Sequence, residues 1–420
     1  MQREQIIFVG TSDYSGHFRG KSFIAADLPA RLERGVGLAP TNLFFSAFGP
    51  IQATPFGTSG EVFLIPDPST RVLVPFDDAS TEYFFIGDIR TIDGEPWAFC
   101  PRHVLRRALD RLEADLKLRL LATFEQEFLY SGVPAQPLQP YELDAYRRQG
   151  AFGEILLGAL RQAGVVPDSF LSEYGAQQFE VTVEPAIGLR AADDAVITRE
   201  ITQAVAYRLG QRVSFTPLPT PDGTSSGTHI HWSFLDADGR PVLYEPGRAW
   251  QMSLLGQQFI AGVLHHLPAL CAVTAPSVAS YYRLRPNRWA PMKADAGVLD
   301  RGTAIRICPA VTGDAAARAR QMNVEFRVAD ATASPYLVLA MLIQAGLDGI
   351  RHGRVVDAAN PQSLPTTLGA ALDLFEASAS LAEWLGPDLH AAYVKFKRAE
   401  VRTLEGCAEA EVCRRYAEVY

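Results

Sequence analysis

The sequence predicts an α+β protein with two domains, and two observations support this prediction. Residues 1–98 hold short β-favouring runs between Gly, Pro and Asp turns, namely Ile6–Val9, Glu61–Ile65 and Tyr83–Ile86. From about residue 101 the apolar spacing becomes helical, and strands then alternate with helices. A chain of 420 residues is long enough for one small and one large domain. We therefore expect a β-rich domain over residues 1–98 and a larger domain over 99–420.

The second domain should begin with a helix over residues 102–120, where Val104, Leu105, Leu109, Leu112 and Leu116 recur at helical spacing. The same criterion predicts further helices over 195–210, 252–267, 335–349 and 383–400. A loop rich in Pro, Gly, Ser and Thr occupies 217–227, directly before a strand that carries two histidines.

Composition excludes several classes of function. The formal net charge of −8, without a basic cluster, argues against nucleic acid as a partner. The longest apolar run, near 336–347, is too short to span a bilayer, and the first residues lack a signal-peptide pattern. Five cysteines without a CxxC pair indicate reduced thiols. We expect a cytoplasmic enzyme with no membrane contact.

Four strand-like runs place polar residues two positions apart, and these runs carry the chemistry. They are FEQEF at 124–128, QFEV at 178–181, THIHWS at 228–233 and VEFRV at 324–328. Side chains two apart on a strand share one face, so each run presents its polar set together. Each run alone is common on surface strands, but buried carboxylates are costly unless cations compensate them. Oxygen ligands with an imidazole favour Mg²⁺ or Mn²⁺ over zinc.

Arginines form a second group with apolar flanks: Arg283, Arg301, Arg306 and Arg327. Guanidinium forks suit phosphate and carboxylate, which suggests an anionic substrate bearing phosphate. The alternative is structural ion pairing with the acids named above. Neither a P-loop nor a GxGxxG motif occurs in the sequence, so metals and arginines would have to hold any nucleotide phosphates.

The order of these segments resembles the glutamine synthetases and their γ-glutamyl-amine ligase relatives over nearly the whole chain. The matching segments are Arg19–Lys21, Pro66–Thr70, Glu125–Glu127, Glu173–Glu180, Ser226–Ser233, Arg283–Pro291, Arg301–Ile307 and Glu325–Leu337. The fold implied is a β-grasp-like N-terminal domain followed by a catalytic domain with a curved antiparallel sheet flanked by helices. The assembly implied is a homo-oligomeric ring, hexameric or dodecameric, with active sites between subunits.

The resemblance also implies roles for residues. Two sets would bind metal ions, namely Glu127, Glu173 and Glu180 for one ion and Glu125, His229 and Glu325 for the other. Four residues would bind ATP: His231 and Ser233 at the nucleotide, and Arg301 and Arg306 at its phosphates. Arg283 and Arg327 would hold the carboxylate substrate, and with Arg301 they would serve catalysis.

The reaction implied is an ATP-dependent ligation in two steps. A carboxylate oxygen of glutamate or a related acid attacks the γ-phosphorus of ATP, which gives an acyl phosphate and ADP. An amine then attacks the activated carbonyl and releases phosphate. Metal ions would neutralise charge on the transferred oxygens and align the reacting groups.

Departures from the family pattern concern the amine. Ammonia-using members keep a glutamate on the loop where this chain has Trp289, and an aspartate in the region that corresponds to 43–60. That region has no acid but contains Phe44, Phe45, Phe48 and Phe56. Aromatic groups offer apolar area and cation–π contact, so an organic amine is expected, in a pocket with Trp289 and Phe56. The alternative is that Trp289 only packs and that Asp295 or Asp300 supplies the base.

The carboxylate side is altered as well. Thr224-Ser225 replaces the Asn-Gly that grips glutamate, and Asn323 replaces a phosphate-facing arginine. Whether the acid is glutamate stays open at this point. The alternatives are a true glutamine synthetase, a catalytically inactive ring of structural or regulatory role, and a phosphotransferase that stops at the acyl phosphate.

Overall fold

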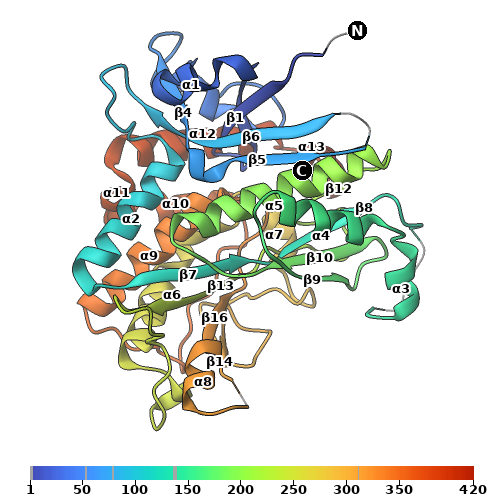
Figure 1. The fold of residues 1–420 in the computed structure, drawn as a ribbon. Helices are drawn as coiled ribbons and strands as arrows, with labels where there is room; N and C mark the ends of the chain where they lie inside the picture. The colour runs from blue at the N-terminus through green and yellow to red at the C-terminus, as the bar shows by residue number, and fades with distance from the viewer. Residues whose placement is uncertain (1–2, 53, 78–79, 136–139, 311) are drawn as a thin grey trace.

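The computed structural model describes residues 3–52, 54–77, 80–135, 140–310 and 312–420. In the N-terminal region, a sheet runs in the order β2-β1-β6-β4-β3, with β5 paired to β6 (Figure 1). In this sheet the pair β1–β6 is parallel, and the other strand pairs are antiparallel. The elements are β1 (Ile6–Ser12), β2 (Phe18–Ile24), α1 (Leu28–Arg34), β3 (Val36–Leu38), β4 (Val62–Pro66), β5 (Val72–Pro75) and β6 (Thr81–Arg90), with short 3₁₀ turns at Ala25–Asp27, Pro40–Phe44 and Pro68–Thr70.

The rest of the chain contains two further sheets. The smaller runs β12-β8-β10-β9 and the larger runs β11-β7-β13-β16-β15-β14. Every pair in them is antiparallel except β14–β15. Their strands are β7 (Arg119–Phe124), β8 (Gln126–Tyr130), β9 (Pro167–Ser172), β10 (Gln178–Val183), β11 (Ala186–Ile187), β12 (Val213–Ser214), β13 (Ile230–Leu235), β14 (Ala296–Val298), β15 (Ile305–Cys308) and β16 (Asn323–Phe326).

The two sheets meet at Glu125. This residue lies between β7 of the larger sheet and β8 of the smaller one, so the chain passes from one sheet to the other there. Its backbone N–H donates to the carbonyl oxygen of His229 at 2.9 Å, just before β13 begins. The alternation of side chains therefore continues through the junction, and Glu125 and Glu127 face the same cavity.

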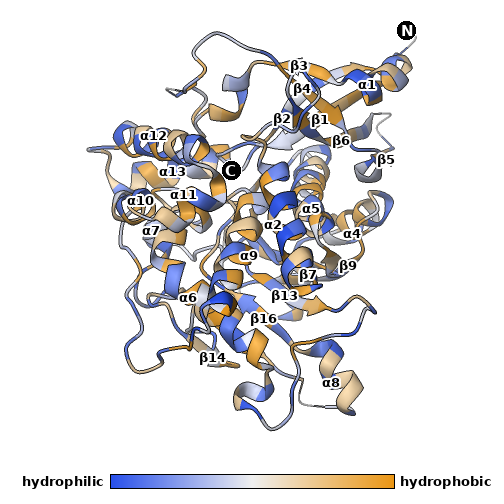
Figure 2. Ribbon diagram, turned by 90° about the vertical axis from the view of Figure 1, so that its left-hand side faces the viewer, coloured by the Kyte–Doolittle hydropathy of each residue, from blue (hydrophilic) through white to orange (hydrophobic). Residues whose placement is uncertain are grey.

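Helices cover the sheets, and α9 lies between α2 and α6 (Figures 1 and 2). The helices α6 and α9 cross at Gly262 and Gly349, where a Cβ on either glycine would approach backbone atoms to 2.2 Å. The helices are α2 (Pro101–Leu116), α3 (Leu143–Arg148), α4 (Phe152–Gln162), α5 (Leu189–Arg208), α6 (Leu254–Thr274), α7 (Ser280–Arg283), α8 (Ala315–Gln321), α9 (Pro335–Arg351), α10 (Leu368–Glu376), α11 (Ala379–Leu385), α12 (Pro387–Thr403) and α13 (Glu409–Val419), with a 3₁₀ turn at Ala249–Gln251. None of the described helices is both long and apolar enough to cross a membrane.

The predicted fold class is confirmed, and some bounds differ. A β-rich N-terminal region is followed by sheets flanked by helices, and α5, α6, α9 and α12 lie at the predicted positions. The helix expected over 102–120 was too long, because Lys117 adopts a left-handed conformation (φ 58°) and ends α2. After it the buried residues Leu118, Leu120, Ala122 and Phe124 alternate with less buried ones, which is strand periodicity.

A buried guanidinium ties the N-terminal sheet to helices α2 and α5, which pack against β7. Arg102, in α2, is only 1% exposed and makes two hydrogen bonds to Asp193 of α5, at 2.9 and 3.0 Å. Its other nitrogen contacts reach Asp67 at 2.8 Å and Asp88 of β6 at 3.0 Å. Tyr336 of α9 donates to the same Asp193 at 2.7 Å. One cation thus holds carboxylates from both parts of the chain.

Replacing Arg102 by Met should lower the free energy of unfolding by about 3–5 kcal/mol, because it leaves the buried Asp193 carboxylate without a counter-ion. The matched control is Arg106→Met on the same helix, where a half-exposed guanidinium pairs with Asp88 at 2.9 Å. We expect that variant to lose less than about 1 kcal/mol. Denaturant unfolding at neutral pH measures both, and equal losses would contradict a linking role for Arg102.

Candidate active site

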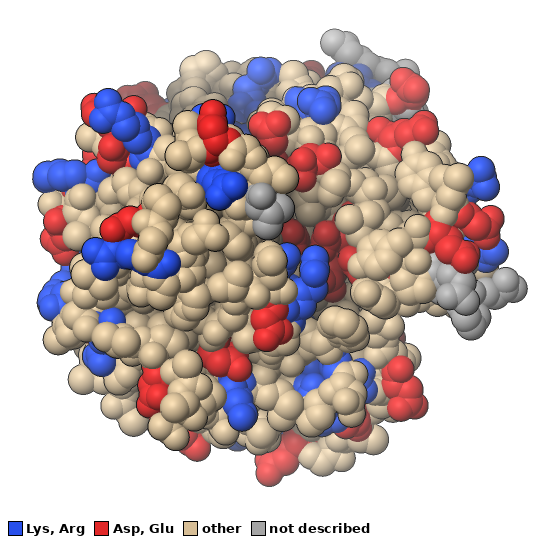
Figure 3. Space-filling model, turned by 90° about the horizontal axis from the view of Figure 1, so that it is seen from below, with Lys and Arg blue, Asp and Glu red and all other residues tan. Residues whose placement is uncertain are grey.

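A cavity of about 1060 Å³ opens at Glu125, where the sheet that contains β7 meets the sheet that contains β8. Viewed from below, the surface is hollowed near its centre, and acidic and basic side chains lie close together there (Figure 3). Most residues predicted from sequence line the cavity: Glu125, Glu127, Glu173, Glu180, His229, Glu325, Arg283, Arg301, Arg306, Arg327 and Trp289. The structure therefore gathers eleven predicted side chains from six separate segments into one site.

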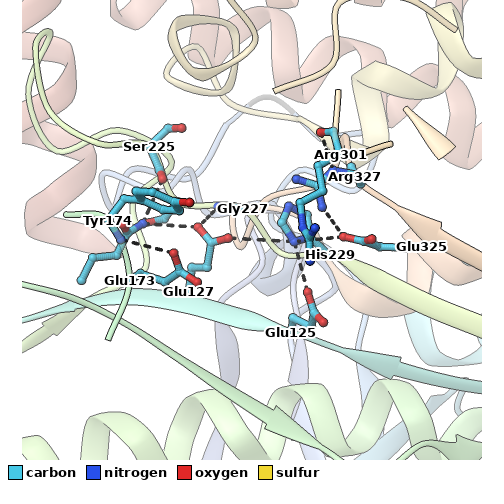
Figure 4. A network of polar contacts seen from close by, with 12 residues as sticks. Glu125, Glu127, Glu173, Tyr174, Ser225, Gly227, His229, Arg301, Glu325 and Arg327 are labelled. Carbon is cyan, nitrogen blue, oxygen red and sulfur yellow. Dashed lines mark hydrogen bonds and ion pairs between the residues drawn. The ribbon is translucent and has the colours of Figure 1, made fainter. Parts of the chain in front are cut away.

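His229 lies at the centre of the acidic group (Figure 4). Its Nδ1 lies 3.2 Å from Glu125, 3.6 Å from Glu325 and 3.9 Å from Glu127. The neighbouring Gly227 donates its N–H to Glu127 at 2.8 Å. A Cβ at Gly227 would lie 2.6 Å from an Arg283 nitrogen, so a larger residue there would have to displace this buried guanidinium.

Two groups of side chains bring ligand atoms within 4.8 Å of one another: Glu125, His231 and Glu325, and Glu125, Glu180 and His229. The predicted sets were divided differently, with Glu127 and Glu173 beside Glu180. Glu127 and Glu173 also line the cavity, and Glu125 is common to both observed groups. The side chains therefore converge on one continuous cluster of oxygen and imidazole ligands.

The charges of this cluster are not balanced within the protein. Burial raises the pKa of Glu173 to about 7, and the neighbouring Glu127 carboxylate adds to the effect. Burial raises the pKa of Glu180 to about 10, and four nearby carboxylates contribute by repulsion. A divalent cation would relieve both desolvation and repulsion. Carboxylate oxygens with few imidazoles are the ligands that Mg²⁺ and Mn²⁺ prefer, so the residues present fit such ions.

Arginines occupy the other end of the cavity, as Figure 4 shows for Arg301 and Arg327. Glu325 accepts a hydrogen bond from Arg306 at 2.8 Å and another from Arg327. Arg283 is buried, and it donates to the backbone carbonyls of Val328 at 2.8 Å and Arg327 at 2.9 Å. This end of the cavity therefore combines several guanidinium groups with one carboxylate and suits an anion.

Three predicted site residues lie outside this lining among the described residues. His231 contacts Glu125 at 2.9 Å and Asn323 at 2.8 Å, behind the acids. Ser233 lies two residues further along β13 and is buried. Phe56 packs in the N-terminal region against Phe44, Trp97 and Phe99 rather than beside Trp289.

Asp295 and Asp300, the two alternative candidates for the base, each accept a hydrogen bond from a nearby backbone N–H. Asp295 accepts the N–H of Ala304 at 2.9 Å, and Asp300 accepts that of Gly302 at 2.8 Å. Neither is among the residues that line the cavity.

Two tyrosines beside the predicted Trp289 at one end of the cavity escaped the sequence reasoning. Tyr174 stacks on Trp289 with ring centroids 6.0 Å apart, and Tyr141 meets Tyr174 edge-on at 5.4 Å. The Tyr141 hydroxyl also donates to the Glu173 carboxylate at 3.2 Å. Tyr174 directly follows Glu173 in the sequence, which was a usable signal, whereas nothing in the pattern linked Tyr141 to this site.

Family models match both parts of the chain. The glutamine synthetase N-terminal domain matches residues 1–97, and the glutamine synthetase catalytic domain matches residues 98–416. The chain belongs to the glutamine synthetase family. The predicted resemblance is therefore confirmed, and the protein is an ATP-dependent ligase of that family, whose members use ATP and divalent metal ions.

Individual relatives cover almost the full chain. A γ-glutamylpolyamine synthetase of Streptomyces coelicolor is 33% identical over 97% of this chain and 92% of its own length. A glutamine synthetase of Mycolicibacterium smegmatis is 28% identical, covering 93% of this chain and 90% of its own. Among solved structures, a novel glutamine synthase homolog superposes with a TM-score of 0.96 at 41% identity, over 100% and 99% of the two chains. An ADP complex of GmaS gives 0.81 at 26% identity, over 96% and 94%.

Divalent cations should stabilise the protein through the acidic cluster. Millimolar Mg²⁺ or Mn²⁺ should raise the melting temperature by several degrees over the value in EDTA, because ligand at about 100 times its Kd adds about 2.7 kcal/mol. The isosteric Glu180→Gln variant should lose most of this rise, while Glu113→Gln, an exposed site on α2, should keep it. Equal rises in the two variants would contradict a cation site at the cluster.

Proposed function

We propose that the protein joins a carboxylate, glutamate or a close relative, to an organic amine through an acyl phosphate formed with ATP. The observation that carries this proposal is the stacking of Trp289 on Tyr174. Both rings lie at one end of the cavity that the acidic side chains line. Ammonium offers no apolar surface to such rings, whereas an alkylammonium ion gains both apolar burial and cation–π attraction. The similarity to a γ-glutamylpolyamine synthetase supports the same choice.

The acidic cluster is proposed to hold two divalent ions, one by Glu127, Glu173 and Glu180 and one by Glu125, His229 and Glu325. The distances of 3.2 and 3.6 Å from His229 to Glu125 and Glu325 support the second set. When bound, the ions would neutralise charge on the phosphate oxygens. Either Mg²⁺ or Mn²⁺ suits these ligands.

Arginines are proposed to orient the anionic groups. Arg301 and Arg306 would contact the ATP phosphates, with His231 and Ser233 at the nucleotide, and Arg283 and Arg327 would hold the carboxylate substrate. Their clustering at one end of the cavity supports this assignment. Bidentate guanidinium contacts fix a carboxylate close to the γ-phosphorus, which converts attack into a nearly unimolecular step.

The two steps then follow from this arrangement. The carboxylate oxygen bonds to the γ-phosphorus as the bond to ADP breaks. The neutral amine next bonds to the acyl carbon, the C–O bond to phosphate breaks, and the amine nitrogen loses a proton. The aromatic end of the cavity would limit the access of water to the acyl phosphate.

The wider setting is also part of the proposal. We propose that the chain divides into domains at 98/99, works in the cytoplasm and assembles as a hexameric or dodecameric ring. Because Phe56 packs against Phe44 and Phe99 in its own chain, it would reach an amine pocket only if the ring brought it to the site of an adjacent copy.

An amine panel tests the proposal. Purified protein with ATP, Mg²⁺ and glutamate should release phosphate and form a γ-glutamyl amide faster with primary alkylamines than with ammonia, as measured by phosphate release and product mass. Faster turnover with ammonia than with any alkylamine would contradict the assignment of an organic amine as substrate. Inactivity with all amines, without nucleotide binding, would favour an inactive ring.

A Trp289→Glu variant extends the same assay. It should move the preference toward ammonia by about tenfold or more, because it exchanges an apolar face for a carboxylate. Trp289→Phe serves as the control and should keep the preference for alkylamines. If Trp289→Glu leaves the selectivity unchanged, Trp289 only packs.

A further inference from the structure

One carboxylate of the cavity is used by neither the ligand cluster nor the arginines. Asp222 lies in the loop before β13, is exposed and lines the cavity. Among the described residues its side chain has no hydrogen-bond or ion-pair partner, unlike the carboxylates of Glu127, Glu173 and Glu325. An anionic group that faces a substrate cavity without a counter-ion is available to a cationic ligand.

The position of Asp222 is fixed by the loop that carries Trp289. Arg288 donates to the backbone carbonyl of Gly223 at 2.8 Å and also to that of Pro221, so its guanidinium brackets Asp222. In return, the Ser225 hydroxyl donates to the Arg288 carbonyl at 3.3 Å. Because the Arg288 nitrogens are engaged with carbonyls, this cation holds the loop without pairing with Asp222.

Exposed aromatic surface adjoins the same loop. Trp289, the residue after Arg288, is 70% exposed although it stacks on Tyr174. Tyr174 and Tyr141 are themselves about half exposed. Figure 4 shows Tyr174 and Ser225 on the side of the site away from Arg301 and Arg327. The rim formed by Tyr141, Tyr174, Trp289 and Asp222 therefore combines aromatic faces with one carboxylate, and the Arg288 guanidinium beside it is engaged by backbone carbonyls.

We propose that this rim binds a second ammonium group at the far end of the amine substrate, so that the preferred amine is a diamine or a longer polyamine. The inference rests on the proposed ligase function and adds a specificity determinant to it. The methylene chain would lie on the aromatic faces while the distal ammonium pairs with Asp222. A monoamine leaves Asp222 without a counter-ion, and an amino acid would bring its carboxylate against Asp222.

Matched pairs of amines test this proposal. Wild-type protein should show a higher kcat/KM for 1,4-diaminobutane than for n-butylamine, and likewise for 1,6-diaminohexane over n-hexylamine. Asp222→Asn should lower kcat/KM for the diamines about threefold to fivefold and change it less than about twofold for the monoamines, since one exposed ion pair is lost. The control Asp110→Asn, an exposed acid on α2, should change neither. The diamine preference should also weaken as salt is raised.

The outcomes separate the two proposals. If Asp222→Asn slows monoamines and diamines equally, Asp222 only supports the loop and the inference is wrong, while the ligase function stands. Equal wild-type rates for matched pairs, or a preference for 2-phenylethylamine, would also overturn the inference alone. If no organic amine is ligated and ammonia is, the proposed function fails, and the inference fails with it.

Discussion

Crowding of carboxylates at the junction of two sheets is the constraint on which this structure depends. Glu125 lies between the last residue of β7 and the first of β8. Its backbone hydrogen bond to His229 brings the start of β13 to the same junction. Like charges this close are stable only with compensation, and the protein supplies it unevenly. Arg306 and Arg327 neutralise Glu325, whereas burial and repulsion raise the pKa values of Glu173 and Glu180.

Because the compensation is uneven, the two ends of the cavity differ in charge and chemistry. The end with guanidinium groups suits phosphate and carboxylate, and the acidic middle suits divalent ions. The far end has aromatic faces and one unpaired acid, which suit an organic cation. Arg102 joins α2, α5 and the N-terminal sheet, and both helices pack against β7, the strand that leads to Glu125.

Strand periodicity predicted which polar side chains share a face, and the resemblance to the glutamine synthetases supplied the catalytic fold and the roles of most site residues. The sequence was less informative where contacts depend on distant segments. The helix expected to reach residue 120 ends at Leu116, since the left-handed Lys117 is a local event that apolar spacing does not report. Tyr141 reaches Glu173 across 32 residues, and Arg288 reaches Gly223 beside Asp222 across 65, so apolar spacing could not link these residues to the site. Phe56 shared an aromatic composition with the amine pocket but packs elsewhere within the chain.

The central claim is that ATP activates the carboxylate before the amine attacks. An isotope experiment tests it most directly, with γ-carboxylate-labelled [¹⁸O]glutamate, ATP, Mg²⁺ and an alkylamine that the protein ligates. Mass spectrometry of the released phosphate should find one ¹⁸O atom transferred per amide formed, because the acyl C–O bond to the labelled oxygen breaks in the second step. Amide formation with wholly unlabelled phosphate would contradict the account.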